Sequence, residues 1–282
     1  METLTLYNGM KIPMLGFGTW GIADDAAAEA GRTAIGLGYR HIDTAQAYGN
    51  ERGVGEGIRS SGVARAELFV TDKIAAERKS YKAAKESIDA SLSEMGLDYL
   101  DLMLIHSPQP WAEWRGEKRY FEENREVWRA MEDACDEGKL RAIGVSNFLA
   151  DDLKSLLPHC RILPAANQLL AHIGNTPEPL IAFCREKGIV VEAYSPIAHG
   201  EALKSPVIVE TAQKYGVSPA QLCIRYILQL GLIALPKASS YAHIRENAEL
   251  SFTISEADMA LLRGADFRDY GSYSHFPVFS GK

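Results

Sequence analysis

The sequence predicts an α/β fold of one class, a closed (β/α)8 TIM barrel, and three observations support this. Eight short apolar segments alternate with segments of helical length along the whole chain, as in a parallel sheet covered by helices. Most of these segments end in a polar or ionisable residue, as strands do at the mouth of an enzyme barrel. The length of 282 residues suits one such barrel, so residues 1–282 are expected to form a single domain.

The expected elements follow one another in a simple order. Residues 3–13 hold two short runs around Asn8-Gly9, a dipeptide typical of a β-hairpin turn. Barrel strands are expected at residues 15–19, 41–44, 68–73, 99–106, 142–147, 165–168, 189–195 and 232–237. The clearest helices are expected at residues 80–95, 122–137 and 177–187. The aromatic-rich C-terminal tail, residues 267–279, is expected to lie over the barrel mouth.

A glycine pattern near the N-terminus suggests a different fold. Gly16, Gly18 and Gly21 form G-x-G-x-x-G, and Asp43 follows at about the distance expected in an open dinucleotide-binding sheet. The alternation of strands and helices continues far beyond six strands, and this favours the closed barrel. The glycines are then expected to let the chain approach a ligand closely at the rim.

Composition and charge limit the partners of the chain. Hydrophobic residues make up 46% and charged residues 24%, which favours a large core and argues against disorder. The net charge of -7 argues against nucleic acid or an anionic membrane as partner, while a local phosphate pocket stays compatible. The N-terminus lacks the features of a signal peptide, and the four cysteines form no C-x-x-C pair. We therefore expect a cytoplasmic monomer that acts on a small molecule.

Three consecutive strands end in residues that can act together on a carbonyl group. Asp43, Lys73 and His106 end neighbouring strands about 4.8 Å apart, and Tyr48 lies in the loop after Asp43. An adjacent ammonium is expected to lower the pKa of the phenol, and a carboxylate to hold that ammonium in place. The imidazole can donate a hydrogen bond to a substrate oxygen. A purely structural ion pair between Asp43 and Lys73 is the alternative interpretation.

The chain resembles the aldo-keto reductase family over nearly its full length. The matching segments fall on successive predicted strands: H-I-D-T-A-Q-A-Y-G-N-E, D-K at 72–73, D-L-M-L-I-H, G-V-S-N-F, A-N-Q, E-A-Y-S-P-I and L-P-K-A. This resemblance implies NADPH-dependent reduction of aldehydes or ketones, with use of NADH left open. It implies Tyr48 as the general acid, assisted by Lys73 and Asp43, and His106 as the residue that orients the carbonyl.

The same resemblance implies the residues that bind cofactor and substrate. Ser146, Asn147 and Gln168 would hold the nicotinamide carboxamide, and Tyr194 would stack on its ring. The other cofactor residues that it implies are Gly18, Thr19, Trp20, Asp43, Ser195, Pro196, Ile197, Lys237, Ala238, Ser239, His243, Glu246 and Asn247. Trp20, Tyr48, His106 and Trp111 would contact the substrate, and both tryptophans lie in predicted rim loops.

One departure from the family pattern concerns cofactor choice. His243 stands where the family often has an arginine that binds the 2′-phosphate, and Arg245 follows two positions later. A guanidinium forks onto phosphate and stays charged, whereas a neutral imidazole does neither. The preference for NADPH is therefore less secure than usual, unless Arg245 substitutes.

Two other classes of function are also considered. A cofactor-binding barrel with little turnover, acting as a redox-sensing or structural subunit, is the main alternative. The complete set of Asp43, Tyr48, Lys73 and His106 argues against it, because such a protein has no need of all four. A metal-dependent hydrolase or lyase is disfavoured, because the strand ends lack a cluster of His, Asp and Glu ligands, and no metal site is predicted.

Overall fold

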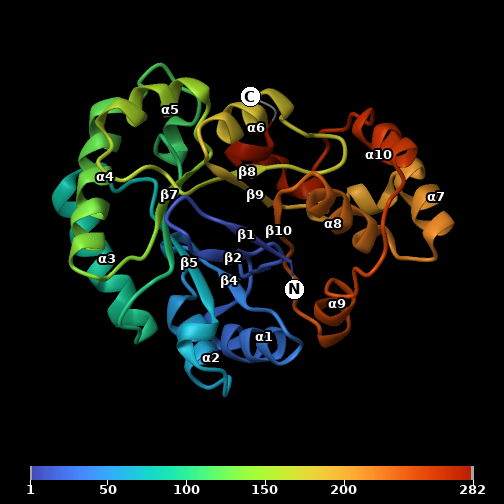
Figure 1. Cartoon of the computed structure of the whole chain (residues 1–282), viewed down its shortest axis with the longest axis horizontal. Helices are drawn as coiled ribbons and strands as arrows, with labels where there is room; N and C mark the ends of the chain where they lie inside the picture. Colours follow the sequence, from blue (N-terminus) through green and yellow to red (C-terminus); the bar gives the residue numbers. More distant parts are fainter. Residues whose placement is uncertain (1, 281–282) are drawn as a thin grey trace.

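The computed structural model describes residues 2–280 and contains the predicted closed barrel (Figure 1). Eight parallel strands pair in the order β10-β9-β8-β7-β6-β5-β4-β3. Their bounds are β3 (Phe17–Gly18), β4 (His41–Asp43), β5 (Phe69–Ile74), β6 (Leu102–Ile105), β7 (Ile143–Ser146), β8 (Ala166–Leu170), β9 (Val190–Tyr194) and β10 (Ile233–Leu235). The ring closes where Leu15 forms a parallel bridge with Ala234 and the Gly16 N–H donates to the Ala234 carbonyl at 2.9 Å.

Helices surround the strands on the outside of the ring (Figure 1). Their bounds are α1 (Asp24–Gly36), α2 (Glu51–Arg59), α3 (Tyr81–Met95), α4 (Phe121–Asp136), α5 (Ala150–Leu156), α6 (Glu178–Glu186), α7 (Pro206–Tyr215), α8 (Pro219–Gln229), α9 (Tyr241–Glu246) and α10 (Glu256–Arg263). The Ser80 side chain caps α3 by accepting from the Ala83 N–H, and Gly188 follows α6 with a φ of +72°. The three predicted helices match α3, α4 and α6 to within one residue at each end.

The predicted N-terminal hairpin covers the end of the barrel where the strands begin. Strands β1 (Thr3–Thr5) and β2 (Lys11–Pro13) pair antiparallel and lie across the middle of the ring in Figure 1. Leu6 and Ile12 pack against apolar residues from the starts of the strands, such as Phe69 and Leu102. This apolar plug leaves the opposite end of the barrel available for chemistry. No helix within residues 2–280 is both long enough and apolar enough to cross a bilayer.

Gly16 allows the barrel to close, whereas Gly18 and Gly21 line the cavity at the barrel mouth, where the glycines are expected to approach a ligand. A Cβ atom on Gly16 would lie 2.5 Å from Leu235 Cδ2 and 2.8 Å from His41 Nδ1. A Cβ atom on Gly18 would lie 3.3 Å from the Leu235 carbonyl oxygen of β10. Gly16 thus approaches neighbouring strands closely, through Leu235 of β10 and His41 of β4.

The C-terminal tail lies over the barrel mouth, as predicted. It contains two 3₁₀ turns, η7 (Gly271–His275) and η8 (Pro277–Phe279). The Trp20 ring lies 5.2 Å from the Phe276 ring and 5.8 Å from the Tyr273 ring, measured between centroids. His199, from the loop after β9, stacks on Tyr273 at 4.1 Å. Aromatic contacts therefore join the tail to the loops that follow the first and seventh barrel strands.

Candidate active site

A cavity of about 610 Å³ opens where the barrel strands end. Its walls come from every barrel strand except β5, either from the strand itself or from the loop after it, together with the C-terminal tail. The four residues that the resemblance assigns to the substrate, Trp20, Tyr48, His106 and Trp111, all line it. The position matches the end of a (β/α)8 barrel that enzymes use.

The structure brings Asp43, Tyr48, Lys73 and His106 together at this cavity. The Lys73 ammonium donates to Asp43 Oδ1 at 2.6 Å, to the Thr44 carbonyl at 2.6 Å and to the Tyr48 hydroxyl at 3.4 Å. The Tyr48 and His106 rings meet edge to face at 5.6 Å. Lys73 itself is fully buried and does not line the cavity, so it reaches the phenol from below.

Burial and nearby charges act in opposite directions on Lys73 and Tyr48. Burial disfavours the Lys73 ammonium, but Asp43 and Tyr48 outweigh it and raise the pKa of Lys73. Burial raises the pKa of Tyr48, and the opposing effect of Lys73 does not overcome it. Lys73 lowers the pKa of Tyr48 as expected, but the expectation of an unusually acidic phenol is wrong, because the burial of the phenolate outweighs the attraction of the ammonium.

His106 carries a neutral imidazole in this site. Burial, followed by the charges of Lys73 and Lys79, lowers the pKa of His106 well below its ordinary value. Its Nδ1 atom is enclosed and has no hydrogen-bond partner among residues 2–280, so Nε2 is the nitrogen available to the cavity. The Trp111 ring lies edge to face on the imidazole at 5.2 Å. A neutral imidazole in this position can donate one hydrogen bond into the cavity.

The predicted nicotinamide residues form one wall of the cavity. Gln168 Nε2 donates to Asp43 Oδ2 at 2.8 Å and to Glu192 Oε2 at 2.9 Å, so its carbonyl oxygen is the group left for a ligand. Asn147 Nδ2 donates to the His106 carbonyl at 3.0 Å, and Asn147 Oδ1 accepts from the Tyr194 hydroxyl at 2.7 Å. Ser146 also lines this wall. Asn147 has a φ of +63°, a strained conformation of the kind found at functional sites.

One part of the cavity wall combines a cation with irregular backbone. Lys237 lines it and makes no ion pair among the described residues 2–280. The loop from Ser195 to Gly200 also lines it, and four of its residues have positive φ values: Ser195, Ala198, His199 and Gly200. Such irregular backbone next to a cation is a typical anion-binding surface.

Several residues assigned by resemblance do not line the cavity: Thr19, Ala238, Ser239, His243, Glu246 and Asn247. Thr19 instead holds the end of strand β4, because its hydroxyl and its N–H both donate to the Asp43 carbonyl at 3.0 Å. Arg245, which could replace the missing phosphate arginine, lies with its Nε atom 3.4 Å from Glu249 Oε1. That guanidinium is engaged on the outer surface of α9.

Comparison with known proteins identifies the family and the architecture. The model of the "Aldo/keto reductase family" matches residues 14–266, which include all the strand ends described above. The chain belongs to the aldo/keto reductase family. It is thus an oxidoreductase of this family, and both the predicted resemblance and the predicted barrel are confirmed.

Three known proteins are similar to this chain over most of its length. Glyoxal reductase of Bacillus subtilis (strain 168) is 40% identical over 260 residues, covering 92% of this chain and 90% of its own. An aldehyde reductase of Saccharomyces cerevisiae is 39% identical, covering 91% of this chain and 88% of its own. A crystal structure of an aldo/keto reductase from Brucella melitensis aligns with a TM-score of 0.86 at 37% identity, covering 93% of this chain and 98% of its own.

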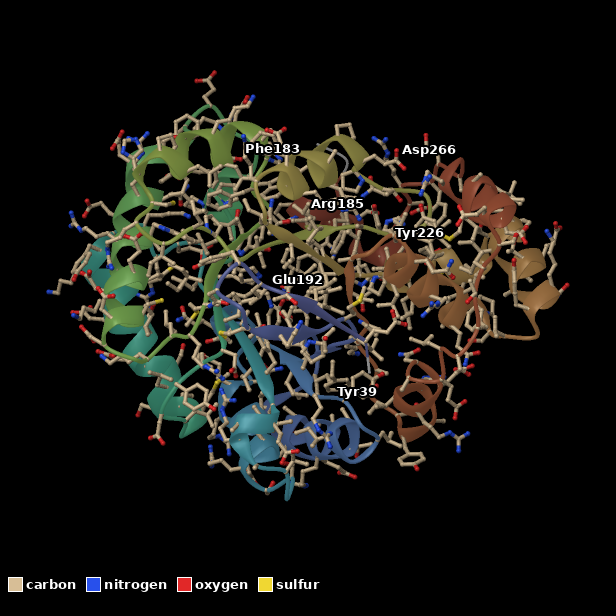
Figure 2. All side chains as sticks on the ribbon, viewed as in Figure 1. Tyr39, Phe183, Arg185, Glu192, Tyr226 and Asp266 are labelled. Carbon is tan, nitrogen blue, oxygen red and sulfur yellow. The ribbon has the colours of Figure 1, made fainter. Side chains whose placement is uncertain are left out.

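Sequence reasoning missed Glu192, a buried carboxyl group beneath the aldo/keto reductase site. It lies inside the ring of strands near the centre of the molecule (Figure 2). Its Oε2 accepts from Gln168, while Oε1 has no hydrogen-bond partner among residues 2–280. Glu192 and Tyr194 are two positions apart in β9, and this spacing places both on one face of the strand. The sequence feature that could have indicated it is an acidic residue in an otherwise apolar strand.

Glu192→Gln is expected to make the protein progressively more stable than wild type as the pH rises. Burial, aided by Asp43, raises the pKa of Glu192 to about 8 in the folded state. The unfolded chain releases this proton near pH 4.3, so wild-type stability falls between about pH 4.3 and about pH 8. The variant cannot ionise, and its advantage should grow by about 4 kcal/mol over this window. Urea unfolding at pH 5 and pH 8 measures it, and a constant difference would contradict the protonated Glu192.

Proposed function

We propose that the protein reduces aldehydes or ketones to alcohols with a nicotinamide cofactor, and that it prefers NADPH. One observation carries the proposal: a buried ammonium contacts both a carboxylate and a phenol at a cavity that also holds a neutral imidazole. The distances from Lys73 Nζ are 2.6 Å to Asp43 Oδ1 and 3.4 Å to the Tyr48 hydroxyl. The glyoxal and aldehyde reductases among the relatives support small carbonyl compounds as substrates.

The proposed acid is Tyr48. The raised pKa of Tyr48 keeps the phenol protonated at neutral pH, so a proton is available for the carbonyl oxygen. The phenolate left behind lies within reach of the Lys73 ammonium, and Asp43 keeps that ammonium charged and in place. His106 donates a hydrogen bond from Nε2 to the same oxygen, and in this way orients the carbonyl next to the phenol.

The residues present fit a nicotinamide cofactor. The bound reduced nicotinamide supplies a hydride for the carbonyl carbon. The Gln168 carbonyl oxygen can accept from the carboxamide, with Ser146 and Asn147 beside it, and the Tyr194 ring offers an aromatic surface. Lys237, which forms no ion pair with any residue from 2 to 280, supplies a cation for a phosphate, and the loop that contains Ser195, Pro196 and Ile197 lines the same cavity.

The adenosine end of the cofactor is assigned from the resemblance. Lys237 is followed in the chain by the segment that enters α9, and we propose that this segment holds the 2′-phosphate and adenine. The residues proposed are Ala238, Ser239, His243, Glu246 and Asn247, together with Gly18, Thr19 and Trp20. Gly18 lies next to this segment, because its N–H donates to the Pro236 carbonyl at 3.0 Å. Trp20 and Trp111 are proposed to contact the substrate, because both line the cavity.

A direct assay tests the function. The purified protein should oxidise NADPH in the presence of glyoxal, other small dicarbonyls or activated aldehydes, and should do so more slowly with NADH. Quenching of tryptophan fluorescence should report cofactor binding in the same samples. Cofactor binding without turnover on a broad carbonyl panel would overturn the proposal in favour of a cofactor-binding barrel.

His243→Arg is expected to strengthen NADPH binding and leave NADH binding unchanged. The exposed imidazole lacks the permanent charge and paired donors of a guanidinium, and Arg245 is already engaged with Glu249. A gain of about 1.4 kcal/mol in one charge-assisted contact corresponds to about tenfold in the ratio of the two Kd values. Fluorescence titration with both cofactors measures the ratio, and Arg245→Ala serves as the control with no expected change. An unaltered ratio in His243→Arg would exclude residue 243 from the phosphate site.

A further inference from the structure

Lys79 holds an unusual position directly behind the cavity. It lies in the loop between β5 and α3, and only part of the residue is exposed. A lysine on a surface normally buries its aliphatic stem and extends the ammonium into water. Here the ammonium is enclosed, and it donates to the Ser107 carbonyl at 2.7 Å and to Asn124 Oδ1 at 2.8 Å.

These contacts fix the backbone that immediately follows His106. Asn124, which is buried in α4, also donates from Nδ2 to the Pro108 carbonyl at 2.9 Å. Lys79 and Asn124 together therefore hold two consecutive carbonyl groups after the imidazole. On the other side, Asn147 Nδ2 holds the carbonyl of His106 itself at 3.0 Å. The strand end that presents His106 is thus bound at three successive residues.

The charge of Lys79 is not neutralised locally. No carboxylate lies within 4 Å of its ammonium among residues 2–280, and both of its hydrogen-bond acceptors are uncharged oxygens. Glu77 from the same loop, Glu123 from α4 and Asp152 from α5 attract it from further away. A lysine charge that lacks a close counter-ion acts on its other neighbours, and His106 is one of them.

We propose that Lys79 is a positioning residue of the carbonyl site: it anchors the backbone after His106, and its ammonium, bound to the Ser107 carbonyl, places a positive charge near the imidazole in addition to that of Lys73. This inference rests on the proposed function, in which His106 must donate to the carbonyl oxygen. Lys73 from β5 contributes a second positive charge to the same imidazole, while the neutral Tyr48 faces it from η1 (Gln46–Tyr48).

The anchor and the charge respond differently to pH. Burial lowers the pKa of Lys79 to about 7, so the group is charged in acid and largely neutral in mild alkali. A neutral amine still has two N–H groups, enough for both of its present hydrogen bonds, so the anchor persists after the proton is lost. Below pH 7 Lys79 is charged, and its charge adds to the burial and to the Lys73 charge that oppose protonation of His106.

The test separates charge from anchoring with three variants of the full chain. Lys79→Gln removes the charge but keeps a donor, Lys79→Arg keeps the charge, and Asn124→Ala removes one anchor without changing any charge. Lys82→Met, which replaces an exposed lysine of α3, is the matched control. The pKa of His106 is measured in the cofactor-free protein by NMR titration of ¹⁵N-labelled histidine, with its signal assigned from its loss in His106→Gln.

Lys79→Gln should raise the pKa of His106 by about half a unit or more, and should move the acid limb of kcat/KM upward by a similar amount. Lys79→Arg, Asn124→Ala and Lys82→Met should leave the His106 titration at the wild-type position. Asn124→Ala should lower kcat/KM severalfold through the loosened loop. Lys79→Met repeats the charge test if the glutamine variant does not fold.

An unchanged His106 titration in folded Lys79→Gln or Lys79→Met would overturn the electrostatic role, and an unchanged kcat/KM in Asn124→Ala would overturn the anchor. The NMR shift does not depend on turnover. A shifted His106 titration in a protein that reduces no carbonyl would therefore support the charge effect of Lys79 and overturn the proposed function instead.

Discussion

Tyr48→Phe should reduce kcat for carbonyl reduction by about 10² to 10⁴, the range typical of a lost general acid. The substitution removes the proton donor and leaves the edge-to-face contact with His106 in place. Lys73 keeps its hydrogen bonds to Asp43 and to the Thr44 carbonyl, so the cavity should keep its shape. The affinity for NADPH, measured by fluorescence quenching, should stay within about threefold of wild type, because a change of this size is below 1 kcal/mol.

The matched control for this variant is Tyr273→Phe. That substitution removes a hydroxyl from another tyrosine that lines the cavity, one whose ring packs on Trp20 and His199. If any lost hydroxyl in the cavity lowered the rate, both variants would be slow. Steady-state and single-turnover rates in Tyr48→Phe that match those of the wild type would remove Tyr48 from the proposed mechanism.

The fold and the positions of the proposed catalytic residues could be predicted because both depend on local pattern. Alternating strands and helices determine the barrel, and the end of each apolar run determines which residue reaches the mouth. Asp43 and His106 were placed in this way, and both line the cavity. Lys73 was also placed at its strand end, but its complete burial beneath Tyr48 depends on how the ring closes, which no local pattern contains.

The features that were missed depend on contacts between distant segments. The direction of the pKa shift at Tyr48 is a balance of burial against one charge, and the sequence supplies the charge but not the degree of burial. Burial and the nearby Asp43 raise the pKa of Glu192, and the one hydrogen bond that opposes them comes from Gln168, 24 residues earlier in the chain, among residues 2–280. Lys79 reads in the sequence as an ordinary loop lysine, and its role requires Asn124 from a helix 45 residues away.

Lys73→Met should abolish measurable reduction and destabilise the fold by about 3–5 kcal/mol, because it leaves the carboxylate of Asp43 buried without its cation. The raised pKa of Lys73 means that the group is charged both folded and unfolded across the neutral range. Its contribution to stability is therefore fully present below its ordinary pKa, and is lost only as the pH rises through the higher folded value. The cost measured by urea unfolding should accordingly stay constant between pH 6 and pH 9.

The double variant Asp43→Asn/Lys73→Met decides between a structural ion pair and a catalytic one. Removing both charges together should restore much of the lost stability, because no unpaired buried charge is left. Activity should not return, since nothing then stabilises the phenolate of Tyr48 after it has donated its proton. A stable double variant that reduces glyoxal at the wild-type rate would show that the pair serves only to close the barrel mouth. A stable but inactive double variant would show that the Lys73 ammonium takes part in the reaction, because the fold no longer depends on the ion pair.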